Sequence, residues 1–131
     1  MLTHIDTVTK TKTRVLVVED DRPSRAALMS LLRLAGFEPI SAATLGEGFA
    51  MLEKNPGFLI LDLMLPDGNG STLLAHIRKN QLPIRVVVTT GAMDYKTMLA
   101  NSPEPPDAVF PKPLDFDGLT RWLESHRHPH P

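Results

Sequence analysis

The sequence of 131 residues predicts an α/β fold, a doubly wound five-stranded parallel sheet with helices on both faces. Short apolar runs alternate with segments whose leucines recur at helical spacing, and this alternation repeats five times along the chain. Several of the apolar runs end abruptly in acidic or hydroxyl residues, which marks the ends of strands. Parallel strands need crossover connections, and these are right-handed, so the repeats place helices on both faces.

The first strand is predicted at residues 15–18, a continuous run of valine and leucine that ends in three consecutive acids at residues 19–21. Such a run is typical of a strand buried on both faces of a parallel sheet. A helix is predicted over residues 24–35 from the spacing of its leucines, and Gly36 is expected to end it. These segments form the first strand and helix pair.

The next two units follow the same order. A short strand is predicted at residues 38–41, and Thr44 with Glu47 forms a capping box that begins the second helix. The third strand, residues 58–61, ends in Asp62. Residues 66–70 are predicted to be loop, and Ser71 is expected to cap the third helix.

The last two units are less regular. A buried strand at residues 86–88 ends in two threonines, and a short helix is predicted within residues 93–100. The proline-rich residues 101–106 must interrupt that helix, so the fourth helix is expected to be short or irregular. A fifth strand at residues 108–110 and a final helix at residues 115–125 complete the pattern.

This reading gives one domain with two tails. Residues 1–13 are rich in threonine and lysine without apolar periodicity, and we expect a flexible N-terminal arm there. The folded domain is predicted over residues 14–125, and residues 126–131 are expected to form a flexible C-terminal tail.

Composition excludes several classes of function. No apolar run approaches the roughly 18 residues of a membrane-spanning helix, so we expect no membrane association and a cytoplasmic protein. The absence of cysteine excludes disulfides, thiolate nucleophiles and cysteine-based zinc sites. The formal net charge of -1 shows no basic excess, so we expect no direct nucleic acid binding.

Polar side chains with complementary chemistry follow four of the predicted strands. Glu19 and Asp20 follow the first strand, Asp62 the third, Thr90 the fourth and Lys112 the fifth. Ligands of open parallel sheets bind outside the carboxyl ends of the strands. These side chains are therefore expected to converge at one edge of the sheet.

Carboxylates brought together in this way repel one another unless a cation lies among them. Oxygen ligands select a hard ion, and Mg²⁺ takes one or two protein carboxylates while keeping a position for a phosphoryl oxygen. Asp20 and Asp62 are suited to bind Mg²⁺ directly. Asp62 is also suited to attack a phosphoryl group and form an aspartyl phosphate, with Lys112 and Thr90 stabilising the transferred group.

The chain resembles the receiver domains of two-component response regulators in four segments that appear in the family's order, VLVVEDD, LILDLMLPDGNG, VVVTTG and FPKP. The resemblance covers residues 14–125. Thr90 lies 28 residues after Asp62 and Lys112 lies 22 residues after Thr90, which fits the family's usual layout. The resemblance implies the flavodoxin-like, CheY-like form of the predicted fold.

The resemblance also implies roles for the acidic residues. Asp62 matches the aspartate that accepts the phosphoryl group. Asp20 matches the direct ligand of Mg²⁺, and Glu19 matches the second acid, which usually acts through water. Met64 matches a residue whose backbone carbonyl binds the metal.

Three further positions match the family. Thr90 corresponds to the switch hydroxyl, Lys112 to the phosphate-binding lysine, and Pro113 to a proline that follows a cis peptide bond. Thr89 is the competing assignment for the hydroxyl. The spacing to Lys112 and the glycine at position 91 favour Thr90.

Two features depart from the family's pattern. Val109 stands where the family commonly has an aromatic ring that turns inward when the switch hydroxyl moves, and Phe110 is expected to face the other side of its strand. The prolines at positions 103–106 replace the end of the fourth helix, which belongs to the family's usual output surface. Whether switching works without an aromatic side chain at Val109 stays open.

The resemblance implies a function in phosphorelay signal transduction. Asp62 would take a phosphoryl group from a sensor histidine kinase or a histidine phosphotransfer protein, and the domain would then change its affinity for a downstream protein or output domain. We expect a signalling domain that catalyses only its own phosphorylation and dephosphorylation, and so no enzyme in the usual sense.

Two alternatives come from other classes. The first is a phosphate-independent interaction module, which the valine at position 109 favours and the intact acids and lysine oppose. The second is an aspartyl-phosphate phosphatase or phosphotransferase. Such enzymes need an acid two residues after the nucleophile, where this chain has Met64. The sequence leaves open the cognate kinase and stimulus, the output partner, the lifetime of the phosphoryl group, assembly as a homodimer, and whether the chain is a stand-alone regulator or a piece of a longer protein.

Overall fold

The computed structural model describes residues 12–91, 93–100, 102 and 104–127. Its main sheet has five parallel strands in the order β2-β1-β3-β6-β7. The strands are β1 (Arg14–Val18), β2 (Glu38–Ala42), β3 (Phe58–Asp62), β6 (Arg85–Thr90) and β7 (Ala108–Pro111). Every predicted strand is present, and the order of the strands reverses at β1, which makes the sheet doubly wound.

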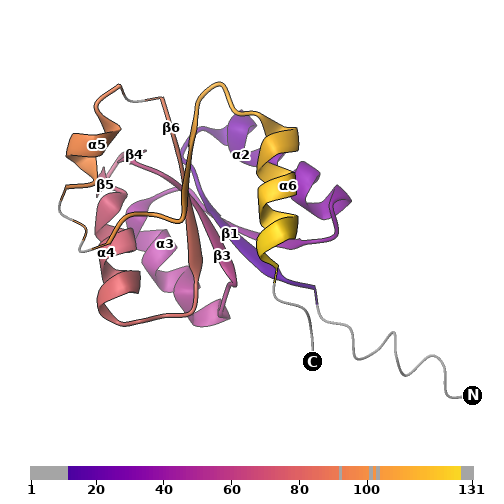
Figure 1. Ribbon diagram of the computed structural model, residues 1–131, viewed down its shortest axis with the longest axis horizontal. Coiled ribbons are helices and arrows are strands. Elements are labelled where there is room, and N and C mark those ends of the chain that lie inside the picture. The colour runs from indigo at the N-terminus through magenta and orange to yellow at the C-terminus, as the bar shows by residue number, and fades with distance from the viewer. Residues whose placement is uncertain (1–11, 92, 101, 103, 128–131) are drawn as a thin grey trace, which may run out of the picture.

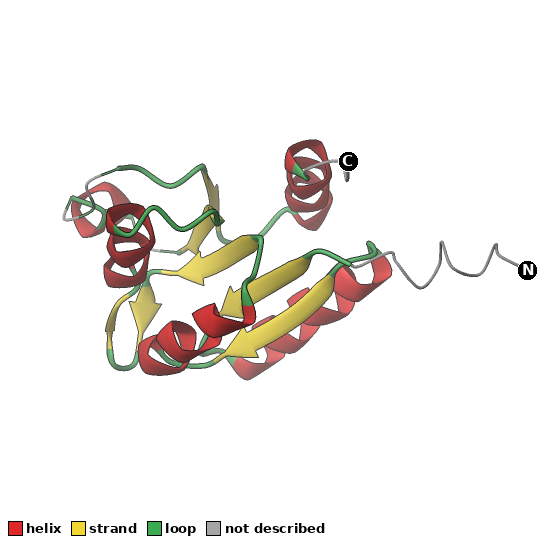
Figure 2. Cartoon of the chain, turned by 90° about the horizontal axis from the view of Figure 1, so that it is seen from below, coloured by secondary structure: helices red, strands yellow, loops and turns green. Residues whose placement is uncertain are grey.

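Helices cover both faces of this sheet, as predicted (Figure 1). One face carries α2 (Arg22–Leu34) and α6 (Phe116–His126), and the other carries α3 (Leu45–Met51), α4 (Ser71–Lys79) and α5 (Tyr95–Met98). A short 3-10 helix, η1 (Leu52–Lys54), continues α3. Figure 2 shows the strands as a twisted layer between the helices.

The central strands have buried side chains on both faces of the sheet. In β3 the side chains alternate, with Leu59 and Leu61 in the cluster beneath α3 and α4 and Phe58 and Ile60 in the cluster beneath α2 and α6. Leu59 and Leu61 are 0% exposed. The continuous apolar runs of the sequence therefore correspond to strands in the middle of the sheet.

Three helices begin at residues other than those predicted, and in α6 the difference is one residue, since Asp115 caps the helix and Phe116 begins it. The first helix starts at Arg22 because the side chain of Asp21 accepts a hydrogen bond from the amide of Ser24 and caps the helix. Ser71 was predicted to cap α4, but it is the first helical residue. Its amide instead donates a hydrogen bond of 2.9 Å to the side-chain oxygen of Asn69. Thr44 is confirmed as the cap of α3, because its side chain accepts from the amide of Glu47. The return bond of the predicted capping box differs, since the side chain of Glu47 accepts from the amide of Ala43 rather than from that of Thr44.

The prediction that residues 66–70 are only loop is wrong. Two short antiparallel strands, β4 (Met64–Leu65) and β5 (Gly68–Asn69), form a hairpin there. Asp67 lies in the turn between β4 and β5 and accepts hydrogen bonds of 2.7 Å from the amide of Leu45 and 3.0 Å from the amide of Gly46. These amides begin α3, so the hairpin is fixed by a helix 21 to 22 residues away in the chain.

Replacing Asp67 by Asn is expected to lower the stability of the domain at neutral pH and to have no effect in strong acid. The hydrogen bonds from Gly46 and Leu45 hold the pKa of Asp67 below its ordinary value, so the ionised form stabilises the fold above about pH 3.8. That contribution is lost as the pH falls through the folded-state pKa. Urea unfolding of both proteins between pH 7 and pH 2 measures it. Curves separated by the same amount at every pH would contradict this role of the charge.

The fourth helix is short, as predicted, and α5 has 4 residues. The side chain of Asn69 donates a hydrogen bond of 3.0 Å to the carbonyl of Met98 at its end. Arg78 of α4 holds the segment that follows, donating to the carbonyl of Pro105 at 3.1 Å and to Asp107 at 2.9 Å. The proline-rich segment is therefore anchored to α4 in the place of a longer helix.

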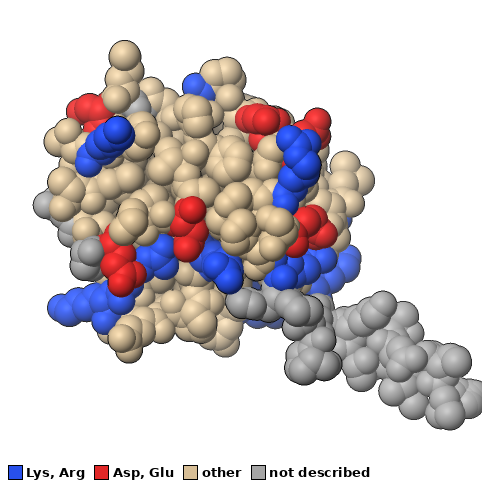
Figure 3. All heavy atoms as spheres, viewed as in Figure 1, with Lys and Arg blue, Asp and Glu red and all other residues tan. Residues whose placement is uncertain are grey.

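In the view of Figure 3, the upper middle of the surface carries mostly uncharged side chains, and acidic and basic side chains cross the part below it. A hollow of about 420 Å³ lies between α5 and β7, and Val109 lines it. Phe110 packs in the opposite cluster, beneath α6, so it does not fill the space beside Val109. The expectation that these neighbours face opposite sides of the sheet is confirmed.

The secondary structure of the described residues begins with β1 at Arg14. The carbonyl of Thr13 accepts a hydrogen bond of 2.9 Å from the amide of Glu38, and α6 continues to His126, the first residue of the predicted tail. Most of the predicted arm and tail, residues 1–11 and 128–131, lies outside the described residues. Within the described part of the chain, no helix combines the length and apolar character needed to cross a membrane.

Candidate functional site

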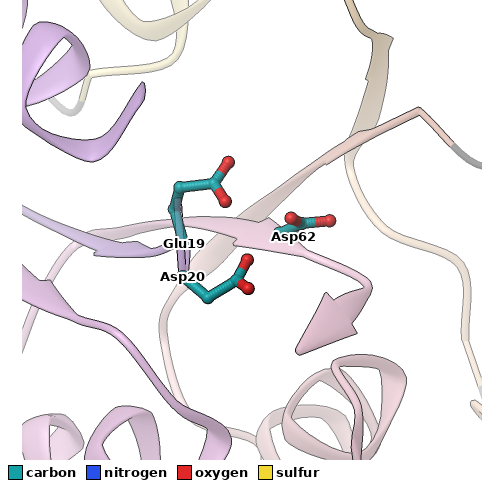
Figure 4. A group of neighbouring side chains, drawn as sticks. All are labelled: Glu19, Asp20 and Asp62. Carbon is teal, nitrogen blue, oxygen red and sulfur yellow. The ribbon is translucent and has the colours of Figure 1, made fainter. Parts of the chain in front are cut away.

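Three carboxylates meet at the carboxyl edge of the sheet (Figure 4). Glu19 and Asp20 directly follow β1, and Asp62 is the last residue of the neighbouring strand β3. One oxygen atom from each of the three side chains lies within 4.8 Å of the other two. Glu19 and Asp62 are each 5% exposed, whereas Asp20 is exposed. The convergence expected from the sheet topology is therefore present.

Lys112 lies among these acids, directly after β7. Its Nζ donates to Glu19 at 2.7 Å and to Asp62 at 3.2 Å. Burial alone would lower the pKa of Lys112, but the hydrogen bond to Glu19 and the charge of Asp62 outweigh it and raise the pKa above its ordinary value. The lysine therefore stays protonated and offsets part of the negative charge.

The backbone around Glu19 and Asp62 holds both carboxylates in place. Glu19 accepts a hydrogen bond of 3.0 Å from the amide of Asp21 through its second oxygen. Asp62 accepts one of 3.2 Å from the amide of Met64. Each acid thus keeps one oxygen on the backbone and one near Lys112.

The two threonines that end β6 are both buried, with Thr89 4% and Thr90 2% exposed. The register pairs Asp62 with Thr89, and Thr90 lies one residue nearer the edge of the sheet. The carbonyl of Thr90 accepts a hydrogen bond of 2.9 Å from the amide of Lys112. Thr90 and Lys112 are therefore joined through their backbones beside the acids.

The sequence did not single out Gly70, which the site needs for steric reasons. A Cβ atom at this position would lie 2.3 Å from the carbonyl oxygen of Asp62 and 3.1 Å from Leu63. The amide of Gly70 donates a hydrogen bond of 2.8 Å to the carbonyl of Leu63. The chain therefore passes so close behind the acid that only glycine fits without a shift of the backbone.

A hollow of about 400 Å³ opens next to the acids, between α2 and the segment that leads from β7 to α6. Glu19, Thr89 and Lys112 line its inner part, and mainly apolar residues line the rest, Pro23, Ala27, Leu28, Pro113, Leu114 and Phe116 among them. The peptide bond between Lys112 and Pro113 is cis, as the family resemblance implied. Of the three acids, Glu19 is the one that lines this hollow.

The donor set fits a hard divalent cation. Carboxylate oxygens are the ligands that Mg²⁺ takes in proteins, and an exposed Asp20 beside two buried acids leaves room for water ligands. Neither cysteine nor histidine lies in this cluster. The residues present therefore suit Mg²⁺ better than a softer metal.

Comparisons with known proteins agree with this geometry. A family model for the response regulator receiver domain matches residues 15–124. The chain is 29% identical over 113 residues to the photosynthetic apparatus regulatory protein RegA of Rhodovulum sulfidophilum, covering 86% of this chain and 62% of RegA. It is 30% identical over 115 residues to the phosphate regulon transcriptional regulatory protein PhoB of Escherichia coli K12, covering 86% of this chain and 50% of PhoB. The chain thus spans between half and two thirds of the length of these relatives.

Solved structures with the same fold include a CheY-like receiver domain protein from Methanospirillum hungatei, with a TM-score of 0.77 and 28% identity over 88% of this chain and 93% of that one. Another is the response regulator TrrA from Thermotoga maritima, with a TM-score of 0.76 and 25% identity over 86% of this chain and 97% of TrrA. The TrrA structure is a complex with Mg²⁺ and BeF.

Proposed function

Because the chain belongs to the family of response regulator receiver domains, which work in phosphorelay signalling, we propose that Asp62 is its phosphoryl acceptor. The arrangement that carries this proposal is the buried carboxylate of Asp62, hydrogen-bonded to Lys112 at 3.2 Å and grouped with two further acids. A carboxylate in this setting is positioned to act as a nucleophile toward phosphorus.

The proposed step is the transfer of a phosphoryl group from a phosphohistidine. A carboxylate oxygen of Asp62 forms a bond to phosphorus while the bond between phosphorus and the imidazole nitrogen breaks, and its electron pair stays on that nitrogen. Lys112 remains protonated and faces the negative charge of the phosphoryl oxygens. Thr90 offers its hydroxyl to one of these oxygens, and Thr89 is the competing candidate.

Glu19, Asp20 and Asp62 are the residues proposed to hold Mg²⁺, together with the backbone carbonyl of Met64. The ion would supply positive charge against the phosphoryl oxygens. The exposed side chain of Asp20 is open to a metal that arrives from solvent, while the buried Glu19 keeps one oxygen on the amide of Asp21. The chain would catalyse only its own phosphorylation and dephosphorylation.

The partners proposed for the domain are a sensor histidine kinase or a histidine phosphotransfer protein as donor, and a downstream protein or an output domain as receiver of the signal. Direct binding to nucleic acid is not expected of this domain, because its formal net charge is -1. We place it in the cytoplasm, and assembly as a homodimer is a further state to test.

The retained acids and lysine argue against a phosphate-independent module. Three acids at one edge cost stability through their repulsion, and a module without phosphoryl chemistry would have no use for them. Met64 argues against an aspartyl-phosphate phosphatase, because it is 60% exposed and offers no carboxylate where such enzymes need an acid.

The test is an intact mass measurement of the protein with acetyl phosphate or phosphoramidate, each with Mg²⁺ and with EDTA. We expect an adduct of about 80 Da that requires Mg²⁺. Reduction with borohydride followed by peptide mapping is expected to place it at Asp62. If neither donor adds mass in the presence of Mg²⁺, the phosphate-independent module becomes the better description.

A further inference from the structure

Arg25, on α2, donates hydrogen bonds to backbone carbonyls of the segment between β1 and α2, which contains Glu19 and Asp20. Its Nη1 donates a hydrogen bond of 2.8 Å to the carbonyl of Glu19 and one of 3.3 Å to the carbonyl of Asp20. Both residues belong to the acidic cluster, and Arg25 follows them by 6 and 5 residues, in the first turns of α2. No sequence pattern marks this contact, since arginine on a polar helix face is common.

This segment needs such a partner because the sheet ends here. The amide of Glu19 still pairs with β2, donating to the carbonyl of Ala42 at 3.1 Å, and the next residues turn away into α2. The carbonyls of Glu19 and Asp20 are therefore held from the helix side, while their side chains lie on the side of Asp62 (Figure 4). Fixing a carbonyl fixes the backbone dihedrals from which the side chain projects.

We propose that Arg25 is a positioning residue for the metal site, which orders the backbone of Glu19 and Asp20 so that both carboxylates are preorganised for Mg²⁺. This inference rests on the proposed function. Arg25 would thus affect metal affinity through the backbone carbonyls of Glu19 and Asp20.

The positive charge of Arg25 and its ordering of the backbone have opposite effects on the affinity for Mg²⁺. Electrostatics alone would make removal of Arg25 strengthen Mg²⁺ binding, because one cation fewer competes for the carboxylates. Positioning makes the same removal weaken binding. Lysine separates the two effects, because it keeps the charge but replaces the planar fork of guanidinium donors with a single flexible ammonium group.

The experiment measures Mg²⁺ binding by calorimetry on the unphosphorylated protein. We expect Arg25→Lys and Arg25→Ala to raise the dissociation constant by about tenfold to a hundredfold, the range known for residues that orient metal ligands. Arg22→Lys is the matched control, because Arg22 is exposed on the first turn of the same helix. Its dissociation constant should equal that of the wild type.

A second readout separates positioning from general destabilisation. The Mg²⁺ concentration that gives half-maximal phosphorylation should rise in Arg25→Lys, while the yield at saturating Mg²⁺ should equal that of the wild type. Thermal unfolding without metal shows that the variant is folded, and Arg25→Lys carries the test if Arg25→Ala does not fold.

Three results would overturn the inference. Wild-type affinity in Arg25→Lys, or tighter binding in Arg25→Ala, would leave Arg25 with only an electrostatic effect. A lower yield at saturating Mg²⁺ with an unchanged dissociation constant would point to damage elsewhere in the site. Failure of the wild type itself to bind Mg²⁺ would instead reject the proposed function, and the positioning role with it.

Discussion

Replacing Asp62 by Asn is expected to abolish the adduct formed with acetyl phosphate and Mg²⁺, while the stability of the fold stays within about 1 kcal/mol of the wild type. An amide oxygen carries no negative charge, so it does not displace a leaving group from phosphorus. Asp62 accepts hydrogen bonds from Met64 and Lys112 through two different oxygens, both 3.2 Å long, and the single side-chain oxygen of Asn can replace only one of these acceptors. The loss of one such bond costs about 1 kcal/mol.

The loss of the negative charge of Asp62 is expected to have two opposing effects on the free energy of unfolding. Asp62 is grouped with Glu19 and Asp20, so its removal relieves repulsion between carboxylates while it also removes an attraction to Lys112. The two effects oppose each other. Function and stability are therefore expected to separate in this variant, which a substitution that merely unfolds the protein would not achieve.

Asp117→Asn is the matched control, because Asp117 is an exposed acid in the first turn of α6 and makes the same chemical change outside the cluster. Intact mass measures the adduct and urea unfolding measures the stability. Equal adduct in wild type and Asp62→Asn would move the phosphoryl acceptor to another residue. Loss of the adduct in Asp117→Asn as well would show that the assay responds to charge rather than to the site.

The parts of this site that could be predicted from sequence follow from one topological rule. Residues that follow the strands of a parallel sheet meet at its carboxyl edge, so Glu19, Asp62 and Lys112 could be brought together although they span 93 residues. The chemistry of the group then followed from its oxygen ligands and its lysine. The order of the strands and the residue types were enough to predict this group, without any interatomic distance.

The contacts that could not be predicted are those made by the backbone. Gly70 approaches the carbonyl of Asp62, and Arg25 donates to the carbonyls of Glu19 and Asp20. A carbonyl is present at every residue, so the sequence carries no pattern that marks which one a distant side chain will contact. Gly70 follows a turn-like sequence in which glycine is common, so its residue type does not indicate a close approach to Asp62.

The fold shows the same division. Buried strands and leucine-spaced helices were predicted because each carries its own periodicity. The hairpin of β4 and β5 was missed because the hydrogen bonds of Asp67 connect it to the start of α3. Serine is common at helix caps, which favours Ser71 as the cap of α4, yet Asn69 accepts the hydrogen bond from the first helical amide.

Replacing Gly70 by Ala is expected to destabilise the domain by about 3 kcal/mol, through overpacking and the loss of a buried hydrogen bond. The added Cβ would lie 2.3 Å from the carbonyl oxygen of Asp62, and the atom it meets belongs to the backbone. A side chain in its path could rotate away, but a strand in the middle of the sheet is held by ladders on both sides. The hairpin must therefore move, which stretches the bond from the amide of Gly70 to Leu63.

Gly91→Ala provides the control for adding a methyl group at the same edge of the sheet. A Cβ at Gly91 would have Lys112 as its nearest neighbour at 3.9 Å, an ordinary contact, so its stability in urea should match that of the wild type. Because the carbonyl of Asp62 shares its residue with the proposed acceptor, Gly70→Ala should also form less adduct than Gly91→Ala at equal folded fraction. Equal stability of the two variants would mean that the hairpin shifts freely. The close approach at Gly70 would then place no constraint on the site.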